Sequence, residues 1–361
     1  MSLIPATILT GFLGAGKTTL LKRILTEAHG QKIAVIENEF GEENIDSDIL
    51  VSDTSEQIIQ MSNGCICCTI REDLRVTLQD LAEKKRKGEL SFDRVVIETT
   101  GLADPGPVAQ TFFMDDEIAE SYLLDSILTL VDAKHAPTQL NDRQEARRQV
   151  GFADQIFISK SELVSKDVLE ALQHRLKHMN PRAPQQTVHF GEVAIKDVFD
   201  LRGFNLNAKL DIDPDFLKVD DHDHAHDHAH HHHAEGEACD HPSHSPSHDH
   251  SHDHSHGHHH HTDDDVKSFV FKSDRPFDPA KLEDFLGAIV NIYGPRMLRY
   301  KGVLYMQGTD RKVIFQGVHQ LMGSDLGPAW GPEEHKSSKM VFIGIDLPKD
   351  ILLQGMEQAL V

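Results

Sequence analysis

Positive charge and long apolar runs are what this 361-residue sequence has least of. It carries 36 Lys and Arg against 58 Asp and Glu, which gives a formal net charge of −22. A protein that binds nucleic acid through its phosphates needs a basic excess to displace counterions, so we expect no nucleic-acid partner. No apolar run reaches the roughly twenty residues that a membrane-spanning helix requires, and we therefore predict no membrane partner.

Cysteine is also scarce. Three of the four cysteines lie within the four residues from Cys65 to Cys68, and the fourth is Cys239. Cysteines this close together cannot form a distributed disulfide framework, which favours a reducing compartment and thiolate chemistry. We therefore predict a cytoplasmic protein.

Histidine and acidic residues are concentrated in one segment. Between Val219 and Asp265 lie 19 of the 26 histidines and twelve Asp or Glu, with no Lys or Arg. With almost no apolar content, this segment cannot offset the entropy of ordering, so we predict that it is disordered without a ligand. It divides the chain into a predicted phosphate-binding domain at 1–205, a linker with the His-rich run at 206–266 and a C-terminal domain at 267–361.

The two outer regions differ in their predicted elements. In the first region, strand-like runs alternate with helical patterns, which predicts an α/β fold with a parallel sheet covered by helices on both faces. The strands are expected at 4–10, 32–37, 94–98, 126–131 and 155–159, and the helices at 17–28, 70–87, 135–149 and 166–178. The last region has closely spaced strands, expected at 267–272, 297–300, 303–307, 312–318 and 340–345, with helices at 279–292 and 350–360. This spacing predicts a small, mostly antiparallel α+β domain.

The clearest functional motif is the glycine-rich run from Gly11 to Thr18, which matches the phosphate-loop pattern without a mismatch. Glycines allow successive backbone N–H groups to turn inward around phosphate oxygens, next to the positive end of the following helix. We expect Lys17 to reach the β- and γ-phosphates and the Thr18 hydroxyl to bind Mg²⁺. The predicted phosphate contacts are Gly11, Gly14, Ala15, Gly16, Lys17, Thr18 and Thr19.

Two further segments bear on the nucleotide. Glu98 ends a buried run and Gly101 follows three residues later, which suits a water-mediated Mg²⁺ ligand and a γ-phosphate-sensing backbone N–H. The run Ser159–Glu162 stands where GTPases of this type carry Asn-Lys-x-Asp. Lys160 can lie against the base and the Glu162 carboxylate can accept from guanine N–H groups, but both outer positions depart from the usual motif. The alternative is that Lys160 and Glu162 are only charged surface residues at the end of a strand and do not contact a base.

Two segments have the chemistry of metal ligands. Thiolates at Cys65, Cys67 and Cys68 select Zn²⁺ or a similar ion over Mg²⁺. No second cysteine pair exists, so the site has an open position, as transfer requires.

The acidic run after the second predicted strand could complete the cysteine site through Glu37 or Glu42, while Glu39 is a candidate for positioning the attacking water. The His-rich run could hold several Zn²⁺ or Ni²⁺ ions weakly, through His222, His224, His226, His228, His250, His252 and His254 among others.

The order of these motifs resembles the CobW-type family of metal-handling P-loop GTPases, and in particular its YjiA-like branch with a His-rich insertion. The residues that carry the resemblance are Gly11–Thr18, Glu37–Gly41, Gly64–Cys68, Glu98–Gly101 and Arg299–Gly302. The resemblance implies GTP hydrolysis coupled to delivery of Zn²⁺, or in some members Co²⁺, to client proteins, with a C-terminal domain involved in partner contact.

The function predicted from the sequence is therefore a GTP-hydrolysing metallochaperone with GTP, Mg²⁺ and Zn²⁺ as its cofactors. Its partners are expected to be metal-requiring client proteins, and a homodimer is possible. Three alternatives stay open: a zinc store or buffer with weak GTPase activity, delivery of Co²⁺ or Ni²⁺, and a small-molecule kinase. The kinase reading leaves the cysteines unexplained.

Overall fold

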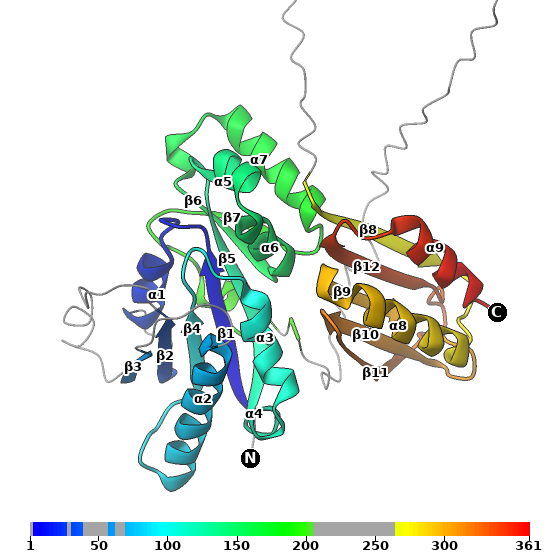
Figure 1. Cartoon of the computed structure of the whole chain (residues 1–361), viewed down its shortest axis with the longest axis horizontal. Helices are drawn as coiled ribbons and strands as arrows, with labels where there is room; N and C mark the ends of the chain where they lie inside the picture. Colours follow the sequence, from blue (N-terminus) through cyan, green and yellow to red (C-terminus); the bar gives the residue numbers. More distant parts are fainter. Residues whose placement is uncertain (1–2, 27–29, 39–56, 62–68, 202, 205–263) are drawn as a thin grey trace, which may run out of the picture. The chain divides into compact units, whose positions relative to one another are not determined.

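A computed structural model of the chain describes residues 3–26, 30–38, 57–61, 69–201, 203–204 and 264–361 (Figure 1). The predictions that concern the three clustered cysteines, Glu39, Glu42 and the His-rich run lie outside the described residues. The described residues on either side of 205–263 belong to one compact unit. They contain two β-sheets.

The first sheet is parallel throughout, as the sequence predicts. Its strand order is β3-β2-β4-β1-β5-β6-β7, and all six neighbouring pairs run parallel. The strands are β1 (Ile4–Gly11), β2 (Ile33–Asn38), β3 (Gln57–Met61), β4 (Arg94–Glu98), β5 (Tyr122–Asp132), β6 (Gln155–Ser159) and β7 (Gln185–Val188). Because the carboxyl ends of parallel strands share one edge, the residues that follow β1, β4 and β6 gather at that edge, where β2 also ends.

Helices connect these strands in the manner of a doubly wound fold. They are α1 (Lys17–Thr26), α2 (Thr69–Lys87), α3 (Pro105–Met114), α4 (Asp116–Ser121), α5 (Ala136–Asp142), α6 (Gln144–Phe152) and α7 (Lys166–Met179), with 3₁₀ turns at Ser161–Leu163 and Ile195–Asp197. The inner strands β1, β4, β5 and β6 are buried along nearly their whole length, as expected for a sheet covered on both faces. The predicted fold class is confirmed.

Several element boundaries differ from the prediction. The single helix expected at 135–149 is two helices, because Arg143 between α5 and α6 is extended, with φ −125° and ψ 117°. The helix α3 was not expected, although Asp104 caps it and Pro105 begins it, which is a typical helix start. The strands β3 and β7 were missed because they are short and carry glutamines in place of an apolar run.

The second sheet is antiparallel, in the order β11-β10-β9-β12-β8. Its strands are β8 (Val266–Ser273), β9 (Met297–Leu304), β10 (Arg311–Val318), β11 (Leu321–Ala329) and β12 (Ser338–Ile345), with helices α8 (Pro279–Tyr293) and α9 (Lys349–Gln358) and a 3₁₀ turn at Gly294–Arg296. Phenylalanines of the sheet pack with apolar residues of α8 and α9 in one core, which includes Phe271, Phe342, Leu286 and Met356.

One prediction for this sheet was wrong, and one strand was not predicted. The separate strands expected at 297–300 and 303–307 are one strand, β9, in which Gly302 packs so closely on β12 that a Cβ there would lie 2.9 Å from the Lys339 carbonyl oxygen. The strand β11 was missed because Gly323, Gly327 and Pro328 weaken its strand pattern.

Arg299 of β9 joins the second sheet to the first. Its guanidinium donates to the Asp154 carboxylate at 2.6 Å and to the carbonyl oxygens of Phe152 and Gly203 at 3.1 and 2.8 Å. Arg299 and Asp154 are both nearly fully buried. This arginine belongs to the Arg299–Gly302 motif, so the structure gives that motif an anchoring role.

Among the helices of the described residues, none is long and apolar enough to span a bilayer.

Candidate functional site

The glycine-rich loop between β1 and α1 is shaped to wrap around an anion. Gly11 leaves β1 with φ +143° against β5, where a Cβ would lie 2.3 Å from the Leu130 carbonyl oxygen. Gly14 and Gly16 have φ values of +73° and +96°, and nothing lies within 4 Å of where their Cβ atoms would be. Open space beside left-handed glycines at the start of α1 leaves backbone N–H groups accessible to phosphate oxygens. The loop therefore fits the triphosphate that its sequence predicts.

Lys17, the first residue of α1, is folded onto this loop. Its Nζ donates to the carbonyl oxygens of Gly11 at 3.1 Å and Phe12 at 3.3 Å, and only 8% of the residue is exposed. Burial lowers the pKa of Lys17, and the Glu98 carboxylate partly opposes this shift. A partly desolvated ammonium held by two carbonyl oxygens can exchange them for the oxygens of a phosphate.

Thr18 and Glu98 come together at the edge of the sheet. The Thr18 hydroxyl donates to Glu98 Oε1 at 3.0 Å, although the two residues are 80 positions apart. Glu37, at the end of β2, is the register partner of Glu98 on β4 and is 7% exposed. Hydroxyl and carboxylate oxygens are the ligands that Mg²⁺ prefers, so Thr18 and Glu98 fit the ion expected there.

The segment after β4 packs directly on the glycine-rich loop. The Thr99 N–H donates to the Leu9 carbonyl oxygen and its hydroxyl to Thr10 Oγ1, both at 2.9 Å. A Cβ on Gly101 would lie 2.6 Å from Leu13 Cα, so only glycine permits this approach. The Gln149 amide, which the sequence did not single out, donates to the carbonyl oxygens of Gly101 at 3.3 Å and Ala103 at 2.9 Å.

The segment continues to the second sheet. Asp104 accepts from Arg148 Nη1 at 2.6 Å and caps α3 by accepting from the Gly106 N–H at 2.9 Å. Gly106 lies under His319, whose Nε2 would be 2.6 Å from a Cβ at that glycine. His319 begins the turn between β10 and β11 and packs edge-on against Phe152, with ring centroids 5.2 Å apart. The glycine-rich loop is therefore connected to the second sheet through residues 101–106.

On the other side of the loop, Ser159 and Lys160 hold it from the end of β6. The Ser159 hydroxyl donates to the Ala15 carbonyl oxygen at 2.7 Å, and Lys160 Nζ donates to the Gly14 carbonyl oxygen and to Asp132 Oδ2, both at 2.8 Å. Lys160 adopts a left-handed φ of 56°. Burial favours the neutral form of Asp132, but hydrogen bonds from Lys160 and His135 outweigh it and hold its pKa below the usual range.

Glu162 follows in a 3₁₀ turn, and its carboxylate is 3.2 Å from His189 Nδ1. It is about half exposed, so it is free of the tight packing that holds Lys160. Asp132 was not predicted as a site residue. The one feature in the sequence that could have indicated it is its position as an acidic residue at the end of a buried strand.

The metal-ligand candidates are only partly placed. Glu37 lies beside Glu98 at the sheet edge. Cys65, Cys67, Cys68, Glu39, Glu42 and the histidines of 222–254 fall outside the described residues. Within the part of the chain that the structure describes, no three His, Cys, Asp or Glu side chains form a group that could hold a metal ion.

Comparison with known protein families finds matches for two parts of the chain. Residues 5–187 match the CobW/HypB/UreG nucleotide-binding domain, and residues 266–360 match the cobalamin synthesis protein CobW C-terminal domain. The zinc chaperone YjiA of Escherichia coli is 39% identical over 351 residues, which is 97% of this chain and 96% of YjiA. The zinc-regulated GTPase metalloprotein activator 1 of Dictyostelium discoideum is 30% identical over 359 residues, which is 90% of this chain and 66% of that protein.

A solved structure agrees with the fold. The crystal structure of zinc-bound YjiA GTPase from Escherichia coli matches with a TM-score of 0.73 and 35% identity, and the match covers 99% of each chain.

Proposed function

Because this chain belongs to the CobW/HypB/UreG family of nucleotide-binding proteins, we propose that it is a GTP-hydrolysing chaperone that delivers Zn²⁺ to metal-requiring client proteins. The observation that carries the nucleotide half of this proposal is the loop from Gly11 to Thr18. It is open toward a triphosphate and is held from both sides, by Gly101 and by Lys160. The zinc half is supported by relatives named as zinc chaperones and by the cysteine cluster in the sequence.

Each residue at the loop has a distinct role in this proposal. Lys17 moves from the loop carbonyl oxygens to the β- and γ-phosphates of GTP, while the backbone N–H groups of Gly14 to Gly16 hold the phosphate oxygens. Thr18 and Glu98 would hold Mg²⁺, with Glu98 as the water-mediated ligand that the sequence predicts. When bound, Mg²⁺ neutralises charge on the phosphate oxygens. Glu39 positions the attacking water, which stays a prediction because it lies outside the described residues.

Guanine is selected, in this proposal, through Lys160 and Glu162. Lys160 already bridges the loop and Asp132, so its methylene chain can lie along a base above Gly14. Ser159 replaces the usual asparagine of this motif, and its hydroxyl still reaches the loop at Ala15. The Glu162 carboxylate then accepts from the guanine N–H groups, which adenine does not offer.

The cargo Zn²⁺ is held by Cys65, Cys67 and Cys68, with Glu37 or Glu42 as a further ligand. The placement of Glu37 supports this arrangement, since its register partner Glu98 belongs to the Mg²⁺ site. Two metal sites that meet on neighbouring strands affect one another, so GTP binding and hydrolysis change the affinity for Zn²⁺. The segment from Gly101 to Gly106 connects the nucleotide loop with His319. GTP binding and hydrolysis can therefore also affect the C-terminal sheet through this segment.

Turnover measurements test the proposal. Hydrolysis of GTP and of ATP is measured with and without Zn²⁺ for the full chain and for the Lys17→Ala, Cys67→Ala and Cys239→Ala variants. GTP should be preferred, Lys17→Ala should abolish turnover, and Cys67→Ala should remove its dependence on Zn²⁺. Cys239→Ala is the matched control, because Cys239 lies outside the cluster, and it should behave as wild type. Faster turnover of ATP, or a Cys67→Ala variant that still responds to Zn²⁺, would contradict the assignment.

The 19 histidines between Val219 and Asp265 favour a second candidate, a zinc store with weak GTPase activity. Two variants distinguish the candidates, one that lacks residues 221–261 and one with Lys17→Ala. For each variant, the activation of a zinc-requiring client protein is measured at limiting Zn²⁺. A chaperone loses more from Lys17→Ala, whereas a store loses more from the deletion.

Delivery of Co²⁺ or Ni²⁺, a homodimer, a cytoplasmic location and the domain limits 1–205, 206–266 and 267–361 stay predictions.

A further inference from the structure

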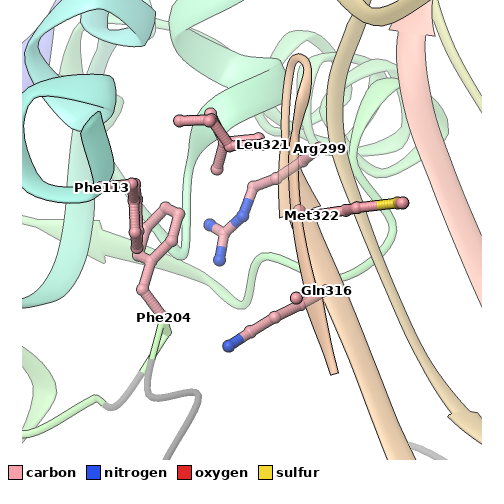
Figure 2. A pocket seen from close by; sticks show the side chains of 9 residues that line it. Phe113, Phe204, Arg299, Gln316, Leu321 and Met322 are labelled. Atoms are coloured by element: carbon pink, nitrogen blue, oxygen red, sulfur yellow. The ribbon is translucent and has the colours of Figure 1, made fainter. Parts of the chain in front are cut away.

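A cavity of about 180 Å³ lies between α3 and the strands β10 and β11 (Figure 2). Most of its wall is apolar and comes from Phe113 of α3, from Phe204, and from Val318 and Leu321 at the β10–β11 hairpin. An apolar protein cavity of about 150 Å³ holds a benzene molecule. This cavity therefore has room for one aromatic or branched aliphatic group.

One polar group in the wall lacks a partner. Gln316 of β10 is 7% exposed, and its Nε2 has no hydrogen-bond partner among the described residues. Figure 2 shows its amide extending from the sheet toward the side where Phe204 lies, while Met322 points away. A buried N–H without an acceptor costs free energy, and a ligand that brings one acceptor recovers it.

The described residues that line the cavity offer a ligand no unpaired charge. Among the described residues that line it, Arg299 alone is charged, and its guanidinium is paired with Asp154 at 2.6 Å and lies 3.8 Å from the centre of the Phe204 ring. Two carbonyl oxygens take further N–H groups of the same guanidinium. A phosphate or carboxylate would have to compete with these partners, so the site favours an uncharged ligand.

The sheet edge beside the cavity is open to pairing. In the described part of the chain, β11 pairs only with β10, and Leu321 to Gly323 at the start of β11 line the cavity. Met322 and Leu326 of this strand are 41% and 48% exposed. An extended polypeptide that adds to such an edge directs every second side chain to the same face of the sheet.

We propose that the cavity and the β11 edge together bind an extended, uncharged segment of a partner polypeptide. One aromatic or branched aliphatic side chain of the partner fills the cavity, a partner carbonyl oxygen accepts from Gln316 Nε2, and the partner main chain pairs with β11. The described lining residues of the cavity include none from the glycine-rich loop. The proposal of a peptide-binding surface therefore does not depend on whether the bound protein receives a metal.

Peptide binding to the full chain tests the proposal. The probe is the uncharged peptide acetyl-Thr-Val-Phe-Val-Thr-amide, and its matched control has glycine in place of phenylalanine. NMR follows the Met322 methyl group and the Gln316 side-chain amide during each titration. We expect both signals to shift saturably with the phenylalanine peptide and affinity to fall at least about tenfold with the glycine peptide, since burial of one aromatic ring is lost.

Three variants locate the binding. Leu321→Trp fills the cavity and should abolish binding, and Gln316→Met removes the donor at similar size and should weaken it at least about fivefold. Ile292→Ala is the control, because Ile292 is 67% exposed on α8 and lines no part of the cavity. Unchanged GTP turnover and a melting temperature no lower than that of wild type show that each variant is folded.

Equal peptide affinity in Leu321→Trp, or no saturable shift with either peptide, would overturn the proposal. Benzene that binds as tightly as the phenylalanine peptide would overturn the assignment to a polypeptide.

Discussion

Replacing Gly101 by alanine tests how the nucleotide loop is built. The added Cβ would lie 2.6 Å from Leu13 Cα and 2.8 Å from Leu13 N, whereas ordinary contact begins near 3.4 Å. The loop and the segment after β4 must therefore separate by roughly 0.8 Å, the difference between 3.4 and 2.6 Å. Overpacking of this kind costs about 1–3 kcal/mol.

That strain should appear mainly as weaker nucleotide binding. The free protein can relax by moving the loop, but a bound triphosphate fixes the loop and the Gly101 segment together. At 1.4 kcal/mol per tenfold change, the affinity for GTP should fall by about 5- to 150-fold. A fluorescent, non-hydrolysable GTP analogue measures the dissociation constant directly.

Gly287→Ala is the matched control for this variant. Gly287 lies within α8, and nothing is within 4 Å of where its Cβ would be. Alanine there should leave the affinity for GTP unchanged and raise the melting temperature slightly, because alanine is the better helix former. If Gly101→Ala bound the analogue within twofold of wild type, the close packing of these two segments would not matter for nucleotide binding, and the reasoning would fail.

Three further predictions concern other contacts of the site and the fold. Thr18→Ala should lower GTP turnover by about 100-fold, because it removes the hydroxyl that Glu98 holds in place for Mg²⁺; turnover within threefold of wild type at saturating Mg²⁺ would argue against this role. Arg299→Met should destabilise the fold by about 3–5 kcal/mol in chemical denaturation, because Asp154 is left buried without a counter-charge; a loss below about 1 kcal/mol would show that water reaches that carboxylate. The depressed pKa of Asp132 gives stability that is complete above its unfolded pKa of about 3.9 and is lost as pH falls through the lower folded pKa. The melting-temperature difference between wild type and Asp132→Asn should therefore be constant above about pH 5 and shrink below about pH 4, and a difference that grows on acidification would reverse the sign of the argument.

The sequence predicted the parts of the molecule that local pattern controls. Strands such as β4 and β6 were placed at their observed limits, because they are apolar runs between a helix and a polar turn. The glycine-rich loop was found because its backbone conformation requires glycine at fixed positions, of which Gly14 and Gly16 have positive φ. The family and the GTPase assignment followed from the order of such motifs, and the comparisons confirm the family.

Contacts between residues far apart in the sequence could not be predicted from local sequence patterns. Gln149 holds the Gly101 segment from a helix 48 positions away, and Lys160 at the end of β6 binds Asp132 at the end of the neighbouring strand β5. Neither residue has a local signature, since a glutamine on a helix and an aspartate at a strand end are common surface residues. Arg299 belonged to a motif that was recognised, but its partner Asp154 depends on the packing of the two sheets.

The coupling between nucleotide and zinc is tested most directly by the affinity of the full chain for Zn²⁺ in three states: with a non-hydrolysable GTP analogue, with GDP and without nucleotide. A chelating dye in competition reports each dissociation constant, and the reciprocal experiment measures the affinity for the GTP analogue with and without Zn²⁺. A coupling free energy of about 1–3 kcal/mol corresponds to a change of about 5- to 150-fold, equal in both directions. Equal zinc affinities in all three states would contradict the account.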